Sequence, residues 1–279
     1  MKFTLKTAAG QNYDAYAYTG GKAFDATKPT LVFIHGVLND HSVWILQTRY
    51  LAHHGFNVLA VDLPGHGRSG GEAPASVEEA AQFIEALLDA AGVKQAGLVG
   101  HSWGSLIALE TAARLKDRIT HLALVGTAFP MKVSPALIEA SLNEPMKALQ
   151  MVNVFSRATL SAPPSALGPG TWVYGASMAL GRRVLASNTQ VNIFHRGFVA
   201  CDSYANGLEA MAAVTCPVLF VLGEADQMTP PRAAKSLIDQ AKAHGKTFTV
   251  TQVPMGHHQM SESPEETLDA LKAFLGLTT

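Results

Sequence analysis

The stretch Gly97-Leu98-Val99-Gly100-His101-Ser102-Trp103-Gly104-Ser105-Leu106 joins a short apolar run to a segment with helical periodicity. A serine in such a strand-to-helix turn is held in a strained backbone conformation that lifts its hydroxyl clear of the sheet. The turn is so tight that side chains two residues before and after the serine would clash, so glycine is required at Gly100 and Gly104. The helix that follows points its first amides at the site and favours an oxyanion there. Ser102 is therefore predicted to be a nucleophile.

The rest of the chain repeats this alternation of apolar runs and helical patterns. Runs without polar alternation are typical of parallel strands that are buried on both faces. Such runs occur at 30–34, 58–61, 97–99, 122–125, 218–222 and 248–253. Two earlier segments, 2–7 and 13–18, alternate as exposed antiparallel strands do. Helical patterns occur at 42–53, 77–91, 104–115, 231–243 and 265–275. This order predicts an α/β fold with a mostly parallel central sheet and helices on both faces.

One interval, residues 131–210, breaks the alternation and contains no convincing buried strand. Its helix-like segments are interrupted by proline and glycine, and they carry many methionine and aromatic side chains. We predict a helical cap, or lid, over the carboxyl edge of the sheet, where open α/β folds bind ligands. Residues 1–130 and 211–279 then form the core domain. Trp172 and Met178 are candidate substrate-binding residues in the cap, although core packing is the more ordinary role for such side chains.

A serine nucleophile needs a general base, and the base needs a carboxylate that orients it and stabilises its charged form. In this architecture the acid follows the serine along the chain, and the histidine comes last. Asp226 stands in the loop that leaves the strand predicted at 218–222, at the edge where Ser102 lies. Asp226 is therefore the predicted acid, and Glu224, two residues nearer the strand, is the alternative.

Two adjacent histidines follow the last predicted strand, in the segment Met255-Gly256-His257-His258-Gln259-Met260. On a short loop beyond the glycine either imidazole fits the role of base, and we expect one of the pair to face solvent. His258 is also a candidate substrate-binding residue. A metal site is not predicted, because adjacent histidines diverge in direction and no nearby acid offers a helical ligand spacing.

Acyl transfer places negative charge on the carbonyl oxygen, and two fixed amide donors typically stabilise that charge. One donor is expected from the residue after the nucleophile, Trp103. The other is expected from the loop after the strand predicted at 30–34, which reads His35-Gly36-Val37-Leu38-Asn39. Gly36 lets the backbone approach the substrate closely, so Gly36 is a candidate substrate contact and the Val37 amide is the candidate donor.

Five motifs in this order resemble those of the α/β-hydrolase superfamily. They are His35-Gly36 after a strand, Asp62-Leu63-Pro64-Gly65-His66-Gly67-Arg68-Ser69 after the next, the turn at 100–104, Gly223 with Asp226 and Pro230, and the segment 256–264. In that family a Gly-His pair, four further residues and Glu-x-Pro surround the catalytic histidine. This resemblance selects His257 over His258 as the base. It covers residues 28–129 and 215–275, and the interval 131–210 falls where the family carries its lid.

Departures from the family's patterns narrow the expected chemistry. A serine nucleophile argues against relatives that use aspartate or cysteine. Many carbon–carbon bond hydrolases carry Gly-Pro-Gly after the first histidine and tryptophan after the catalytic one, and neither is present here. The resemblance implies a serine hydrolase that cleaves a small ester, thioester or lactone through an acyl-enzyme. A carbon–carbon bond hydrolase acting on a diketone and a non-catalytic ligand receptor are the alternatives.

Composition limits the partners and the compartment. Of the 279 residues 48% are apolar, which is enough for a large core, and the net charge of −1 comes without a basic block that would bind nucleic acid. The first ten residues lack the apolar core of a signal peptide, and the longest apolar runs are far short of a membrane span. Cys201 and Cys216 have no zinc-ligand spacing. We expect a cytoplasmic monomer or homodimer that acts on a small-molecule acyl substrate, without membrane, metal or cofactor.

Overall fold

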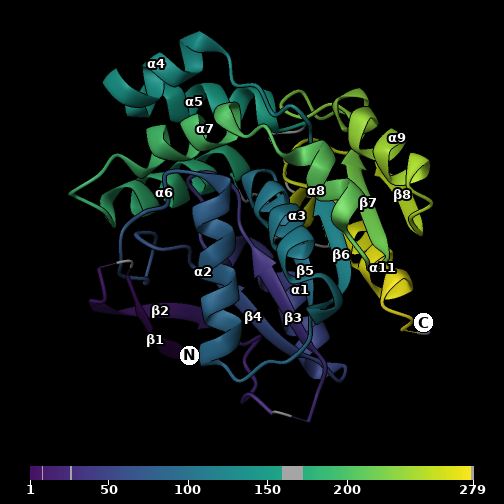
Figure 1. Ribbon diagram of the computed structural model, residues 1–279. Coiled ribbons are helices and arrows are strands. Elements are labelled where there is room, and N and C mark those ends of the chain that lie inside the picture. The colour runs from purple at the N-terminus through teal and green to yellow at the C-terminus, as the bar shows by residue number, and fades with distance from the viewer. Residues whose placement is uncertain (8, 26, 159–171, 278–279) are drawn as a thin grey trace.

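A single mixed sheet organises the computed structural model, which describes residues 1–7, 9–25, 27–158 and 172–277. The sheet has eight strands in the order β1-β2-β4-β3-β5-β6-β7-β8 (Figure 1). The pairs β1–β2 and β2–β4 are antiparallel, and all the other pairs are parallel. The strands are β1 (Lys2–Lys6), β2 (Asn12–Tyr18), β3 (Thr30–Ile34), β4 (Asn57–Val61), β5 (Ala96–His101), β6 (Ile119–Val125), β7 (Val218–Gly223) and β8 (Phe248–Val253). The predicted α/β fold with a mostly parallel sheet is therefore confirmed.

Burial along most strands follows the residue patterns, but the expectation of a strand buried on both faces at 248–253 is wrong: β8 lies at the edge of the sheet, and only Val253 in it is buried. Every residue of β3, β4, β5 and β7 is buried, as expected for apolar runs between two layers of helices. β1 alternates instead, with Phe3 and Leu5 buried and the residues between them exposed. The apolar pattern at 122–125 marks only the second half of β6, because this strand begins at Ile119.

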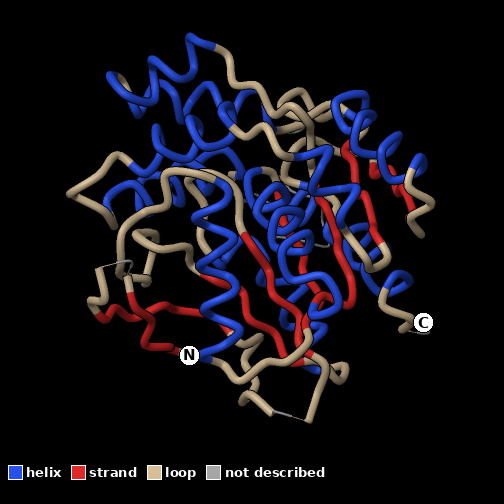
Figure 2. Tube along the Cα trace, in the orientation of Figure 1, coloured by secondary structure: helices blue, strands red, loops and turns tan. Residues whose placement is uncertain are grey.

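Helices cover both faces of the sheet (Figure 2). Consecutive strand residues such as Leu98 and Val99 belong to different hydrophobic clusters, one on each face. On one face α2 (Val77–Ala90), α3 (Trp103–Leu115) and α9 (Lys235–Ala243) bury their apolar sides. On the other face lie α1 (Ile45–His53) and α11 (Pro264–Phe274). The shorter helical segments are η1 (His41–Trp44), η2 (Lys116–Arg118), η3 (Pro231–Ala234) and α10 (Gln259–Glu262).

Between β6 and β7 the described chain forms helices and no sheet strand, as the pattern at 131–210 predicts. These helices are α4 (Pro135–Asn143), α5 (Pro145–Ser156), α6 (Val173–Ala186), α7 (Ile193–Ser203) and α8 (Gly207–Ala213). α4 to α7, here called the helical insertion, gather at the top of Figure 1 over a hydrophobic cluster of their own. α8 packs instead against α3 and α9. Residues 159–171 lie outside the described residues, and the division into core and cap remains a prediction.

Helix starts in this region follow ordinary capping chemistry. α4 begins where the Ser134 hydroxyl accepts a hydrogen bond from the Leu137 amide (3.3 Å), with Pro135 at the first helical position. Within the described residues, no helix has both the length and the apolar character that crossing a membrane requires.

Candidate active site

Ser102 lies between the end of β5 and the start of α3, at the carboxyl edge of the sheet. Its backbone angles are φ 53° and ψ −121°, a region that residues other than glycine rarely adopt. A Cβ atom on Gly100 would overlap the carbonyl group of Gly104, and one on Gly104 would overlap the carbonyl oxygens of Ile34 and His35. Backbone atoms therefore surround the turn, and glycine at both positions is what allows it to close.

The candidate base and acid form a buried pair beside this turn. His257 Nδ1 lies 2.8 Å from Asp226 Oδ2, and the other carboxylate oxygen accepts hydrogen bonds from the amides of Met228 and Thr229, both at 2.8 Å. Burial alone would raise the pKa of Asp226. The charge and hydrogen bond of His257 and the bonds from Thr229 outweigh it and hold that pKa well below its usual range. The acid is thus ionised at neutral pH.

A third side chain, Thr229, joins this pair. Its hydroxyl lies 2.8 Å from Asp226 Oδ2, 3.0 Å from His257 Nδ1 and 2.9 Å from the carbonyl oxygen of Gly126. The hydroxyl has one proton, so it donates to one of these oxygens at a time. No sequence motif predicts this residue. The available signal is the spacing of Asp226 and Thr229, because an aspartate that caps the amide three residues on is typical of a turn.

His258, the neighbour of the candidate base, is buried too, with 8% of its surface exposed. The expectation that one of the two histidines faces solvent is therefore wrong. The helical insertion covers this loop, since the His257 amide donates to the carbonyl oxygen of Ser156 at the end of α5 (2.6 Å). Burial, and next the positive charge of Arg157, hold the pKa of His258 well below its ordinary value, so this imidazole is neutral.

His101 packs beneath the turn and connects it to the loop that follows β8. Its Nε2 atom donates to the carbonyl oxygen of His257 (2.7 Å), which fixes the loop that carries the candidate base. Burial, and next the neighbouring His257, lower the pKa of His101 to about 3. The ring is therefore neutral at physiological pH, and its role in this position is to fix the loop.

The loop after β3, which carries the candidate oxyanion donor Val37, lies against Ser102. A Cβ atom on Gly36 would lie 3.1 Å from the Cβ of Ser102, so the loop passes directly against the serine. His35 fixes this loop: its Nδ1 donates to the carbonyl oxygen of Gly36 (2.8 Å), and its Nε2 accepts from the Leu63 amide (3.1 Å). Val37 then lines the cavities beside Ser102.

The second candidate donor is the amide of Trp103, the first residue of α3. The first amides of a helix have no partner within the helix, so they are free to bind an oxyanion. The indole of Trp103 is 1% exposed and belongs to the hydrophobic cluster under α3. This side chain therefore packs in the core and does not wall the substrate site.

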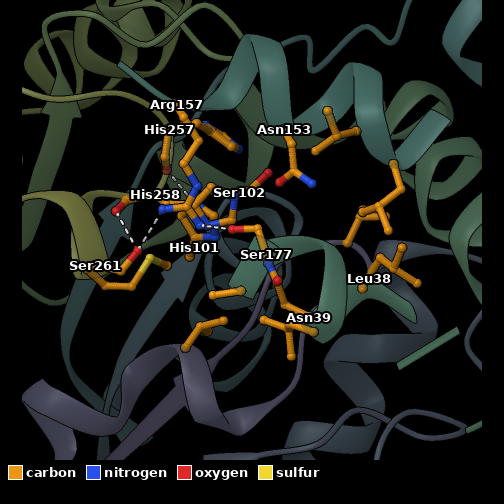
Figure 3. A pocket seen from close by; sticks show the side chains of 18 of the residues that line it. Leu38, Asn39, His101, Ser102, Asn153, Arg157, Ser177, His257, His258 and Ser261 are labelled. Atoms are coloured by element: carbon orange, nitrogen blue, oxygen red, sulfur yellow. Dashed lines mark hydrogen bonds between the residues drawn. The ribbon is translucent and has the colours of Figure 1, made fainter. Parts of the chain in front are cut away.

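Two cavities, each of about 260 Å³, flank the candidate nucleophile. The first, called here the α6 cavity, is walled by α1, α5, α6 and α7 (Figure 3). The second, the α4 cavity, is walled by α4, α5, α7 and the segment 131–134. Both cavities share Val37, Ser102, Phe198, Met228 and His257. A substrate whose reacting carbonyl sits at Ser102 therefore has room for one arm on each side.

Of the four predicted substrate-binding residues, the structure places two beside the candidate nucleophile and two away from the cavities. His258 lines the α6 cavity, and Gly36 adjoins Ser102. Trp172 and Met178 are not among the residues that line either cavity. The side chain of Trp172 is 65% exposed and lies over Gly175, at the start of α6. Met178 packs in the interior of the insertion, where its sulfur accepts from the amide of Asn153 (3.0 Å).

One cluster has the composition of a metal site: Asp40, His41 and Asp62, whose ligand atoms lie within 4.8 Å of one another. Its carboxylates already accept strong donors. Asp40 Oδ2 accepts from Arg183 (2.7 Å), and the carboxylate of Asp62 accepts from the amides of His41 (2.8 Å) and Arg68 (2.9 Å). The His41 bond connects the loops after β3 and β4, and the Arg183 bond ties the first of these loops to α6, so structure alone explains the cluster.

The fold and the site together define a hydrolase of the α/β class. A serine stands at the strand-to-helix turn, a buried His–Asp pair lies at the same sheet edge, and cavities open beside them. The chain belongs to the α/β-hydrolase fold family, whose model matches residues 29–264.

Comparisons with single proteins agree with this family. A dihydrolipoyllysine-residue acetyltransferase component of an acetoin cleaving system, from Cupriavidus necator, is 36% identical over 40% of this chain. The match covers only 28% of that protein's length. Among solved structures, an esterase from Exiguobacterium antarcticum superimposes with a TM-score of 0.79 at 17% identity, over 99% of this chain and 100% of that one. An enol-lactonase from Burkholderia xenovorans gives 0.77 at 22% identity, over 95% and 97%. At these identities the solved structures establish the fold alone.

Proposed function

We propose that this hydrolase cleaves a small ester-like substrate, an ester, thioester or lactone, through an acyl-enzyme formed on Ser102. The observation that carries the proposal is the buried pair of His257 and Asp226, 2.8 Å apart, whose imidazole lines the same two cavities as Ser102. A neutral imidazole oriented by an ionised carboxylate is the arrangement that activates a serine hydroxyl.

The steps follow from the atoms that are free. His257 Nδ1 is held by Asp226, so Nε2 is the nitrogen that accepts the proton of Ser102 as the hydroxyl oxygen attacks the carbonyl carbon. The imidazolium then protonates the leaving alcohol or thiol. Water, deprotonated by the same nitrogen, attacks the acyl-enzyme and releases the acid and the free serine.

The negative charge of each tetrahedral intermediate falls on the former carbonyl oxygen. In this proposal the amides of Val37 and Trp103 bind that oxygen. Fixed amides in a site shielded from water typically contribute about 3 kcal/mol each to transition-state stabilisation. The close approach of Gly36 to Ser102 supports this assignment, because it brings the preceding loop within reach of the reacting carbonyl.

Two further observations favour ester-like substrates. Each cavity holds about 260 Å³, which suits the arms of a small molecule. The solved neighbours include proteins named as an esterase and an enol-lactonase, and both names describe cleavage of a carbonyl–oxygen bond.

The test is replacement of Ser102 by alanine. The Ser102→Ala protein should lose turnover of short 4-nitrophenyl esters and labelling by a fluorophosphonate, while Ser203→Ala, a change in α7 away from both cavities, should keep both. Undiminished labelling of Ser102→Ala would overturn the proposal. Saturable ester binding without turnover by the wild type would favour a receptor on this scaffold.

The choice of base has its own test in the adjacent pair. His257→Ala should lose turnover by several orders of magnitude, as expected when a triad member is removed. His258→Ala should keep the acyl-enzyme chemistry, since Asp226 orients the ring of His257. The opposite result would assign the base to His258.

A further inference from the structure

Arg157 stands out in the wall of the α6 cavity. It follows the end of α5 and is the only arginine, lysine, aspartate or glutamate among the described residues that line this cavity. The guanidinium donates to the hydroxyls of Ser177 and Ser261, and it lines the same cavity as His258 and Ser102 (Figure 3). Among the lining residues that the structure describes, an arm of substrate would therefore meet one full positive charge and no carboxylate.

The guanidinium of Arg157 has more hydrogen-bond donors than the two bonds to serine hydroxyls use. One terminal nitrogen donates to the Ser177 hydroxyl (2.5 Å), and the other makes a long bond to the Ser261 hydroxyl (3.4 Å). Within the described residues the buried Nε atom of Arg157 has no hydrogen-bond partner. A guanidinium carries five N–H groups, and a buried donor without an acceptor is costly. The two serine hydroxyls leave N–H groups of Arg157 available for further acceptor oxygens.

The positive charge of Arg157 interacts with the carboxylate of Glu262, which does not line the cavity. Burial lowers the pKa of Arg157, and the nearby carboxylate of Glu262 offsets part of this lowering. That carboxylate accepts the amides of Ala158 (3.0 Å) and His258 (3.3 Å), and Glu262 does not line the cavity. Glu262 therefore favours the ionised guanidinium without occupying the space in front of it.

We propose that Arg157, with the hydroxyls of Ser177 and Ser261, binds a carboxylate carried by one arm of the substrate. This inference deepens the proposed function and rests on it. A carboxylate fits because its two coplanar oxygens match the donor fork of arginine, and one arginine balances its single charge. The hydroxyls can rotate to donate to the same oxygens. Arg157 is then a specificity-determining residue that selects acidic esters over neutral ones.

The experiment compares matched substrates that differ in one charge. 4-Nitrophenyl hydrogen adipate and its methyl ester place the carboxylate or its neutral form on the acyl side. 4-Carboxyphenyl butyrate and its methyl ester place it on the alcohol side. For at least one pair, the wild type should prefer the acid in kcat/KM, and Arg157→Gln should lower that acid-to-neutral ratio about 30-fold, as for the loss of charge-assisted hydrogen bonds. The acid-to-neutral ratio of Arg157→Lys should fall between those of the wild type and Arg157→Gln.

Arg182→Gln is the matched control, since Arg182 is exposed on α6 and does not line the cavity. It should leave the ratio unchanged. A wild type that prefers the neutral ester in both pairs overturns the proposal, and so does an unchanged ratio in Arg157→Gln. The wild-type preference is measured without any substitution, so a variant that fails to fold does not remove the test.

Failure of the hydrolase proposal is distinguished by binding. Ser102→Ala protein should bind monomethyl adipate more tightly than dimethyl adipate in calorimetry, with Arg157 intact. If no ester is turned over but this preference is found, the result supports the carboxylate site at Arg157 and contradicts the proposed acyl-enzyme on Ser102. If esters are turned over and no preference for the acid is found, only the carboxylate site falls.

Discussion

The two sides of the site are built in different ways. On the sheet side, backbone atoms hold the reacting groups: Ser102 sits at φ 53° between glycines, and two amides grip the carboxylate of Asp226. On the side of the helical insertion, the cavity wall consists mostly of apolar side chains, such as Leu149 and Phe194, with Arg157 among them. The chemistry therefore depends on backbone geometry, while the choice of substrate depends on side chains that can change without altering the sheet.

Two glycines show the contrast directly. A Cβ atom on Gly104 in α3 would strike the backbone carbonyl groups of Ile34 and His35, which the sheet holds in place. A Cβ atom on Gly181 in α6 would instead meet the methyl groups of Leu149, at 2.6 and 2.8 Å. The end of a leucine side chain can rotate away, whereas a carbonyl group in a strand cannot.

The largest expected effect comes from comparing these two positions. Gly104→Ala should destabilise the protein by more than about 4 kcal/mol or prevent it from folding, because the added methyl group has no room. Gly181→Ala should change the free energy of unfolding by about 1 kcal/mol or less, since alanine also favours the helix. Urea denaturation measures both. A stable, active Gly104→Ala protein would show that the turn is less tightly held than its geometry indicates.

A second prediction concerns the acid on the sheet side. Asp226→Asn should keep the fold and lower kcat for ester turnover roughly 10⁴-fold, as the same change does in the serine-protease triad. Asparagine donates as well as accepts, so it favours the wrong tautomer of His257. Glu224→Gln is the control: Glu224 is exposed, and its change should leave kcat within about twofold. Comparable losses in the two variants would reopen the choice of acid.

The third prediction uses the buried histidines of the sheet side. Burial, and next a neighbouring histidine, lower the pKa of His66 and of His101 to about 3, and the pKa of His258 is also held well below its ordinary value. In the unfolded chain these groups titrate near their ordinary value of about 6.5. The stability they provide is thus complete above about pH 6.5. It is lost as the pH falls toward the folded values, by about 1.4 kcal/mol per pH unit for each histidine.

Urea unfolding between about pH 6 and pH 4 measures this loss. The ionised carboxylates of Asp62 and Asp226 have a pKa below the ordinary value of 3.8, so their contribution is lost only at more acidic pH. In His66→Gln, the free energy of unfolding should fall less steeply with decreasing pH, by about 1.4 kcal/mol per pH unit. An unchanged slope would mean that His66 binds its proton equally in both states.

The sequence predicts one side of this molecule better than the other, for a physical reason. Strands buried on both faces leave continuous apolar runs, so the sheet and its edge loops are predicted to within a few residues, and the structure brings Ser102, Asp226 and His257 together there. Arg157 is not predicted, because its place depends on how the insertion packs over the sheet. The exposure of Trp172 is not predicted either, because the sequence of a helical segment does not show which face an aromatic residue occupies.

The smallest expected effect tests the insertion as a selector of substrates. Leu180 is a half-buried residue of α6 that lines the α6 cavity, and Leu142 of α4 is 53% exposed and lines neither cavity. Leu180→Ala removes methyl groups from the wall, so an arm longer by one methylene gains space. Burial of a methylene is worth about 0.8 kcal/mol, or roughly fourfold in kcat/KM.

A graded series of 4-nitrophenyl esters, from acetate to octanoate, measures the effect. In Leu180→Ala the ratio of kcat/KM for the longer to the shorter ester should rise roughly fourfold per added methylene where the new space is filled. The rate of the preferred ester should stay high, because Ser102 and His257 are held by the sheet edge. Leu142→Ala should reproduce the wild-type series. If Leu180→Ala instead lowers kcat/KM equally for all esters, the insertion contributes to the reaction itself. The two sides of the site would then not have separate roles in catalysis and in substrate selection.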